Sequence, residues 1–217
     1  MIDAVETALR QLAKKGYCQM GGPSDKQALA LQDRLGHVIH IEQVRSDATG
    51  PALVSSQHSL SPHTDHHAAH FVLWRCLEQA EWGGDSLVVD GLALVAALPA
   101  HHREALRGIR LVEHNIFEGD VDEHPMLTTS PDGGERLYYS YWLADETLAG
   151  AARAAFDMFS NALEVVPVHR VRLRPGDLLV VNNHRMLHGR TRIGGNRTRH
   201  LVRYWLAPQP HAKVSPR

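Results

Sequence analysis

The chain has 217 residues, of which 43% are hydrophobic and 22% charged, and its formal net charge is −1. The length suits one globular domain with a sizeable core. The small net charge argues against a nucleic-acid-binding protein, and the lack of a basic amphipathic helix or of an apolar run of about 18 residues argues against a membrane protein. Two cysteines are too few for a disulfide framework. We therefore expect a reduced, cytoplasmic protein with neither nucleic-acid nor membrane partners.

The predicted elements begin with two helices, over residues 3–15 and 25–35, separated by a turn that contains Gly21, Gly22 and Pro23. Short runs rich in Val, Leu and aromatic residues follow, and turn residues bound most of them, as in β-strands. The predicted strands cover about residues 37–44, 51–57, 69–78, 85–91, 110–117, 135–142, 165–173, 177–183 and 198–206.

Two helical stretches interrupt these strands. One covers about residues 91–108 and is broken at Pro99, and the other covers about 145–164 with an apolar face. The consecutive strands over 165–206 favour a double-sheet jelly roll over an alternating α/β fold. We predict a mainly β, double-stranded β-helix fold with outer helices. A single domain over 1–217 would consist of a helical cap at about 1–35 and a jelly-roll core at about 36–207.

Sixteen histidines direct attention to metal ligands. In an extended segment, residues two positions apart point to the same side, so His63 and Asp65 would converge on one ion. His188, expected just beyond a strand, would complete a site of two histidines and one carboxylate. Such a site leaves three positions open on a six-coordinate metal and suits a non-haem Fe(II) oxygenase.

The same stretch contains Asp-His-His at residues 65–67, which is similar to the signature of a phosphoesterase family that uses two metal ions. That family needs further aspartates at the ends of parallel strands, whereas the upstream aspartates here fall in predicted helices and a loop. We therefore interpret the tripeptide as a chance match and His66 and His70 as bystanders. A metal-dependent hydrolase and a non-catalytic metal-binding jelly roll remain the alternative functions.

Two arginines follow His188 on the last predicted strand. Arg199 and Arg203 are four residues apart and share one face of that strand. A guanidinium binds a carboxylate through two parallel hydrogen bonds, so an inward-facing pair would anchor an acid such as a 2-oxo acid. Taken alone, the pair would be interpreted as two arginines on the surface of an edge strand.

Together, the segments "SPHTDHH", "EWGGDSLVVDG" and "RPGDLLVVNNHRMLHGRTRIGGNRTRHLVRYW" resemble the Fe(II)/2-oxoglutarate-dependent dioxygenases of the taurine dioxygenase, clavaminate synthase and gamma-butyrobetaine hydroxylase family. The resemblance covers roughly residues 35 to 207. It implies an enzyme with Fe(II) bound by His63, Asp65 and His188, and with 2-oxoglutarate as cosubstrate.

The resemblance also implies roles for the residues around the metal. Ser86 and Arg199 would bind the far carboxylate of 2-oxoglutarate, and Arg203 would bind its near carboxylate or an anionic substrate. Asn183 would support the distal histidine, while Asn182 departs from the aspartate that is common at its position.

The expected reaction is hydroxylation of a small molecule, an amino acid or a biosynthetic intermediate, by O2 and 2-oxoglutarate with release of succinate and CO2. Related halogenases replace the carboxylate ligand with a small residue, so Asp65 favours hydroxylation, with desaturation or cyclisation as alternative outcomes. The candidate substrate-binding residues are His67, Tyr139, Tyr141 and Arg190. The substrate and the oligomeric state are left open.

Overall fold

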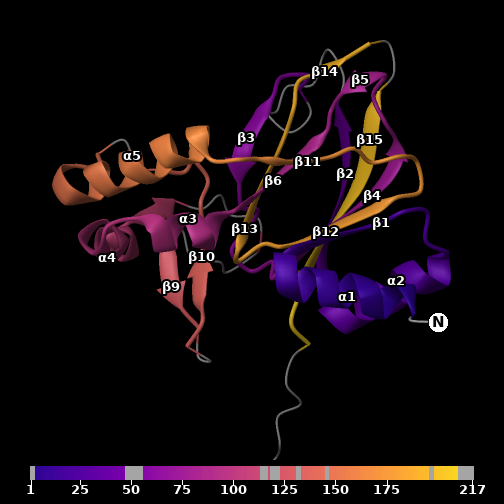
Figure 1. Ribbon diagram of the computed structural model, residues 1–217, viewed down its shortest axis with the longest axis horizontal. Helices are drawn as coiled ribbons and strands as arrows, with labels where there is room; N and C mark the ends of the chain where they lie inside the picture. Colours follow the sequence, from indigo (N-terminus) through magenta and orange to yellow (C-terminus); the bar gives the residue numbers. More distant parts are fainter. Residues whose placement is uncertain are drawn as a thin grey trace, which may run out of the picture.

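The computed structural model describes residues 3–46, 56–112, 117, 123–130, 133–144, 147–195 and 198–209. The described chain is mainly β, with five helices (Figure 1). The prediction of a mainly β protein is thus confirmed. None of the helices in the described part of the chain has the length and hydropathy needed to cross a membrane.

The larger sheet has five strands, and all neighbours in it are antiparallel. In spatial order the strands are β1 (Tyr17–Met20), β12 (Leu178–Asn182), β4 (Phe71–Glu78), β15 (Arg199–Ala207) and β2 (His37–Ser46). The register places Arg203 of β15 opposite Glu42 of β2 on one side and opposite Trp74 of β4 on the other. Side chains of directly opposed residues lie on the same face of a sheet, so these three are neighbours.

A second antiparallel sheet has four strands. In spatial order they are β11 (His169–Val171), β6 (Ser86–Asp90), β13 (Met186–Arg190) and β3 (Leu60–His63). Two residues predicted to act together are direct partners here, because His188 of β13 lies opposite His63 of β3. His188 lies beyond β12, the strand after the Arg-Pro-Gly-Asp turn, as expected, and is itself part of the next strand, β13.

The two sheets pack face to face, and their inner faces share one apolar core (Figure 1). Its buried members come from β4, β12 and β15 of the larger sheet and from β6, β11 and β13 of the smaller one, and they include Val72, Cys76, Val88, Val171, Leu179, Val181, Met186 and Leu201. Residues that alternate along these strands therefore point into the space between the sheets.

Two helices, α1 (Ala4–Lys15) and α2 (Asp25–Leu35), cover the outer face of the larger sheet. Both predictions are confirmed, and side-chain caps begin both helices: Asp3 accepts a hydrogen bond from the backbone N–H of Val5, and Ser24 forms a capping box with Gln27. Strand β1 lies between the helices and was not predicted.

A second helical layer stands beside the smaller sheet (Figure 1). It contains α3 (Gly91–Ala97), α4 (Ala100–Gly108) and α5 (Gly150–Val165), and Pro99 separates the first two as predicted. The apolar face of α5 is buried, including Ala155, Phe156, Phe159 and Leu163. Two short strand pairs complete this region: β7 (Arg110–Val112) with β8 (Glu123–Pro125), and β9 (Leu127–Thr129) with β10 (Glu135–Leu137). A third pair, β5 (Trp82–Gly83) with β14 (Ile193–Gly194), lies apart from the helical layer, at the top of Figure 1.

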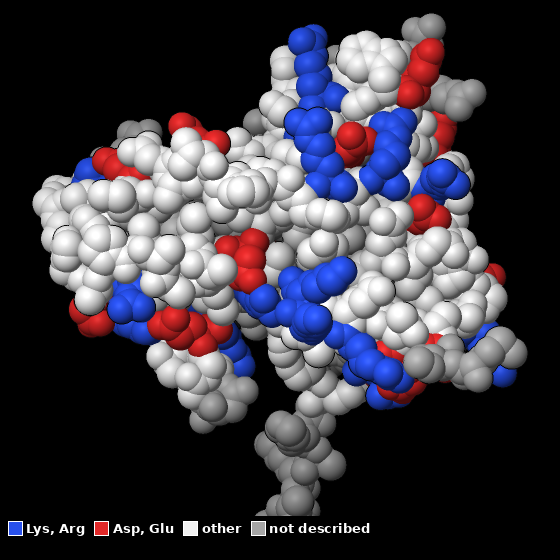
Figure 2. All heavy atoms as spheres, viewed as in Figure 1, with Lys and Arg blue, Asp and Glu red and all other residues white. Residues whose placement is uncertain are grey.

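Some strand predictions differ from the structure. The run predicted over 135–142 is strand only to Leu137, and a backbone bond from Leu143 N–H to Ser140 carbonyl then turns the chain. The run over 51–57 and the end of the run over 110–117 lie mostly outside the described residues. On the face shown in Figure 2, the Lys and Arg side chains have Asp and Glu side chains among them.

Candidate active site

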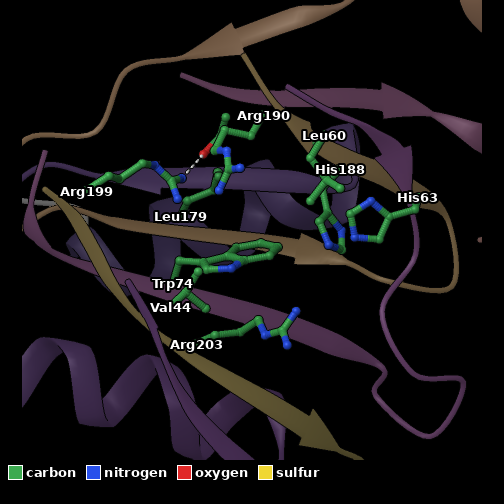
Figure 3. Close-up of a pocket in the computed structure, with 11 residues that line it drawn as sticks. Val44, Leu60, His63, Trp74, Leu179, His188, Arg190, Arg199 and Arg203 are labelled. Atoms are coloured by element: carbon green, nitrogen blue, oxygen red, sulfur yellow. Dashed lines mark hydrogen bonds between the residues drawn. The ribbon is translucent and has the colours of Figure 1, made fainter. Parts of the chain in front are cut away.

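The pairing of β3 with β13 places two imidazoles side by side between the sheets. The ring centroids of His63 and His188 are 4.6 Å apart, and both residues are buried (Figure 3). Asp65, two residues beyond His63, directs its Oδ1 at both rings, 3.9 Å from His63 Nε2 and 3.5 Å from His188 Nε2. The structure therefore brings the three predicted ligands together.

The donor atoms of these three residues lie within 4.8 Å of one another, and no other group of three His, Cys, Asp or Glu side chains does so in the described part of the chain. His66, His67 and His70 do not belong to this group. The Asp-His-His string thus contributes only its aspartate. Two imidazole nitrogens and one carboxylate oxygen form a set of ligands suited to Fe(II).

Hydrogen bonding leaves the facing nitrogens available. His63 Nδ1 lies 2.9 Å from the carbonyl oxygen of Ser61 and donates to it, which leaves the lone pair of Nε2 for a metal. Both ring nitrogens of His188 are buried and have no hydrogen-bond partner among the described residues. Buried polar atoms are nearly always paired, so an imidazole in this state fits the place of a metal ligand.

His63 and Asp65 also have the protonation states that metal ligands need. Burial, and then the neighbouring His188, lowers the pKa of His63 to about 3, so the ring is neutral at physiological pH. Burial by itself raises the pKa of Asp65, but Arg203 and then His188 outweigh it and hold the pKa below its usual value. A neutral imidazole and an ionised carboxylate are the forms that bind metals.

Both oxygens of Asp65 have partners on the larger sheet. The indole N–H of Trp205 donates to Oδ2 at 2.8 Å, and Nη1 of Arg203 donates to Oδ1 at 2.7 Å. The other terminal nitrogen of Arg203 donates to Glu42. The sequence did not single out Trp205 or Glu42, although Trp205 follows the same alternation as Arg199 and Arg203, whose positions are all buried on β15.

Thr64, which lies between the ligands His63 and Asp65 in the sequence, is held by hydrogen bonds to the turn after β10. Its N–H donates to the carbonyl oxygen of Tyr139 at 2.7 Å, and its hydroxyl accepts from the N–H of Tyr139 at 2.9 Å. The hydroxyl of Ser140 donates to the carbonyl oxygen of Thr64 at 3.1 Å. These bonds fix the backbone of the turn and with it the directions of His63 and Asp65.

Asn183 supports the segment after Asp65, and in the described part of the chain the ring of His188 has no hydrogen bond to it. Its Oδ1 accepts from the N–H of Asp65 at 2.8 Å, and its Nδ2 donates to the carbonyl oxygens of Asp65, His66 and Ala69. The role that the resemblance implied for this residue is therefore corrected: it orients the carboxylate ligand instead of His188.

A pocket extends between the sheets from the two histidines to Arg199, whose guanidinium lies at the opposite end (Figure 3). Nη2 of Arg199 donates to the hydroxyl of Ser86 at 3.5 Å, and Nε donates to the carbonyl oxygen of Gly84 at 3.0 Å. Burial, and then the charge of Arg190, lowers the pKa of Arg199 to about 9, so the side chain remains a buried cation at neutral pH. A cation and a hydroxyl at one end of a pocket form a site for a carboxylate.

Glycine is needed where the chain passes this cation. Gly84 has φ 69°, and a Cβ there would lie 3.0 Å from Cδ of Arg199. The side chain of Arg172 holds the same loop, donating to Asp85 at 3.0 Å and to the carbonyl oxygen of Gly83. The Gly-Gly-Asp-Ser segment therefore positions Ser86 beside Arg199 through its backbone.

The structure separates the four predicted substrate residues. The side chain of Tyr139 is buried, with its hydroxyl 3.1 Å from that of Ser160 on α5, and Tyr141 is 37% exposed. His67 stacks on His124 with a centroid distance of 3.2 Å. Only Arg190 lines the pocket described above.

Arg190 and Trp142 have different relationships to the site. Arg190 donates to the hydroxyl of Ser46 and to the carbonyl oxygens of Ser56 and His58, at 2.7–2.8 Å. The ring centroid of Trp142 lies 4.8 Å from that of His63, and Trp142 is 38% exposed. No sequence pattern indicates this contact, because it depends on the turn after β10.

Residues 3–205 match the protein family described as "Taurine catabolism dioxygenase TauD, TfdA family". The chain is 24% identical over 222 residues to gamma-butyrobetaine dioxygenase of Homo sapiens, which covers 89% of this chain and 57% of that protein. The chain thus spans little more than half the length of the curated relatives it matches.

Two solved structures show the same fold. Asparagine oxygenase in complex with Fe(II), 2S,3S-3-hydroxyasparagine and succinate has a TM-score of 0.72 at 18% identity, covering 94% of this chain and 78% of that one. The non-heme iron oxygenase OrfP in complex with Fe and alpha-ketoglutaric acid has a TM-score of 0.70 at 16% identity, covering 94% of this chain and 79% of that one.

Proposed function

Because this chain belongs to the TauD/TfdA family of dioxygenases, we propose that it is an Fe(II)- and 2-oxoglutarate-dependent oxygenase that hydroxylates a small molecule. One observation carries the proposal: a buried group of two histidines and a carboxylate shares a pocket with a buried arginine–serine pair. A hydrolase has no evident use for the arginine–serine pair, and a protein that only binds a metal does not require it.

His63, Asp65 and His188 would hold the iron. Trp205 would orient the carboxylate, and Arg203 keeps it charged before the metal binds. Bound iron would supply the activation of O2 that is coupled to conversion of 2-oxoglutarate into succinate and CO2. The residues of the chain would bind and orient the reactants and exclude water, since all five are buried.

Arg199 and Ser86 would bind the far carboxylate of 2-oxoglutarate. They lie at the end of the pocket opposite the histidines, which suits a cosubstrate with one acid group at the metal and another at a distance from it (Figure 3). Arg203 lies nearer the metal ligands and would bind either the near carboxylate or an acidic group of the substrate.

The proposal includes a cytoplasmic, single-domain protein with a double-stranded β-helix core. Two facing antiparallel sheets and the likeness to Fe(II) oxygenase structures support this fold. The substrate would be an amino acid or a biosynthetic intermediate, because two similar structures contain hydroxylated asparagine and hydroxylated arginine. Desaturation or cyclisation would use the same residues and would be recognised by the product.

Binding of 2-oxoglutarate to the protein with Fe(II), without O2, tests the proposal. The wild type should give a weak visible absorption band, and Arg199→Ala should weaken 2-oxoglutarate binding by about tenfold or more, because it removes the partner of a buried carboxylate. Arg170→Ala, on the exposed side of β11, is the matched control and should bind as the wild type does. A screen of amino acids and small acids for succinate formation in air should then identify the substrate.

Two results would contradict the proposal. Absence of the band together with absence of succinate formation in air would indicate a jelly roll without this activity. Unchanged 2-oxoglutarate affinity in Arg199→Ala would show that the far carboxylate binds elsewhere.

A further inference from the structure

Arg203 lies between two carboxylates. Its Nη1 donates to Oδ1 of Asp65 at 2.7 Å, and its Nη2 donates to Oε2 of Glu42, the residue directly opposite it on β2. The Arg203 and Asp65 side chains are only 10% and 5% exposed, whereas Glu42 is 40% exposed. Glu42 thus reaches the buried site from its edge, and neither metal binding nor carboxylate binding as proposed above uses it.

The contact between Arg203 and Asp65 involves the oxygen that a metal needs. Oδ1 faces Nε2 of both His63 and His188, while Oδ2 is already bonded to the indole of Trp205. A divalent cation and a guanidinium at one oxygen repel each other, and the repulsion is strong where water is excluded. A metal at Oδ1 would therefore favour a position of Arg203 away from that oxygen.

We propose that Glu42 is a positioning residue that holds Arg203 when Asp65 binds the metal. A guanidinium that left Asp65 without another partner would be a buried, uncompensated charge, which is strongly unfavourable. Glu42 already bonds the second terminal nitrogen, so Arg203 stays paired and its Nη1 becomes available at the metal site. This inference rests on the proposed metal-binding function.

In this proposal Arg203 weakens metal binding, and Glu42 strengthens it by holding Arg203. Without Glu42, Arg203 would bond to Asp65 alone before the metal binds and would have no carboxylate partner afterwards. Both effects weaken metal binding. Without Arg203, the metal would meet no competing cation, and Glu42 would have no guanidinium to hold.

Metal affinity without 2-oxoglutarate tests this directly, through anaerobic Fe(II) titration followed by tryptophan fluorescence and calorimetry. Glu42→Gln should weaken Fe(II) binding by about tenfold, the lower end of the range for residues that support metal ligands. Arg203→Met should tighten it. In the Arg203→Met background, Glu42→Gln should change affinity by less than about twofold, because a double-mutant cycle isolates the coupling of the two residues.

Two further variants test whether the effect depends on the place of the Glu42 carboxylate or on the loss of any negative charge. Glu6→Gln is a matched control, because Glu6 is 43% exposed and is bonded to Arg34 at 2.7 Å, far from the metal ligands in the fold; it should bind Fe(II) as the wild type does. Glu42→Asp retains the carboxylate and should recover most of the affinity lost in Glu42→Gln. If Glu42→Gln does not fold, the Fe(II) affinity of Glu42→Asp tests the inference in its place.

Each other outcome overturns the inference. Unchanged Fe(II) affinity in Glu42→Gln would show that Glu42 does not act on the site. An equal loss in the Arg203→Met background would show that Glu42 attracts the metal by its charge without acting through Arg203. Failure of the wild type to bind Fe(II) would overturn the proposed function as well, and so the two failures are distinguishable.

Discussion

The indole N–H of Trp205 donates a 2.8 Å hydrogen bond to Oδ2 of Asp65, and this bond directs Oδ1 at His63 and His188. The donor comes from the larger sheet and the two histidines from the smaller one. The geometry of the candidate metal site is therefore set by how the two sheets pack, in addition to the strand that carries each ligand.

Replacing Trp205 with Phe tests this relationship. The variant keeps an aromatic ring but loses the hydrogen bond that orients the carboxylate, so Fe(II) affinity should fall by about tenfold. Anaerobic titration by calorimetry would measure it. Trp82→Phe, at a residue that is 58% exposed, is the control and should have no effect. Equal affinity of Trp205→Phe and the wild type would show that the indole only fills space.

Replacing Asn183 or its neighbour Asn182 with Asp should change the free energy of unfolding by different amounts. Asn183→Asp would replace an NH2 group that donates to three carbonyl oxygens with an oxygen that repels them, so the free energy of unfolding should fall by about 2–4 kcal/mol. The side-chain oxygen of Asn182 accepts from the N–H of His184 at 3.1 Å, and an aspartate retains this bond. Asn182→Asp should therefore be nearly neutral in denaturant unfolding. Equal stability of the two variants would contradict this account.

For Arg190 the expected effect is on stability. Arg190→Met would leave a serine hydroxyl and two carbonyl oxygens without their buried donor, and the free energy of unfolding should fall by about 2–4 kcal/mol. Arg192→Met, at an exposed neighbouring position, serves as the control in the same urea titrations. A stable Arg190→Met variant that loses affinity for the substrate would instead support the sequence-based prediction that Arg190 binds substrate.

The lowered pKa of His63 predicts a dependence of stability on pH in the metal-free protein. Between its pKa of about 3 in the folded protein and its ordinary value of 6.5, the unfolded chain binds a proton that the folded protein does not. The contribution of His63 to stability is therefore complete above about pH 6.5 and is lost as the pH falls toward 3.

Urea unfolding with a chelator present would measure this effect. Over that range the wild type should lose up to about 1.4 kcal/mol more per pH unit than His63→Gln, whose side chain does not titrate. Parallel pH profiles for the two proteins would show that His63 titrates normally in the folded state.

The alternation in the last strand made one part of the site predictable. Arg199 and Arg203 share a face, and that face is buried, as expected for strands of a sheet with one side on the core. The same reasoning was wrong for Tyr139 and Tyr141, because the strand ends at Leu137 and the following turn sends one ring into the helical layer and the other toward solvent.

By itself, the sequence determined the local features: the two N-terminal helices, the break at Pro99, and the types and spacing of His63 and Asp65. Neighbouring atoms decide these features, so a short stretch is sufficient to predict them. Only the tertiary structure decided that Trp205 and Arg203 hold Asp65, that Glu42 holds Arg203, and that Arg190 is bonded to backbone carbonyls. Those contacts depend on strand register and on sheet packing, which the chain fixes only when segments more than a hundred residues apart come together.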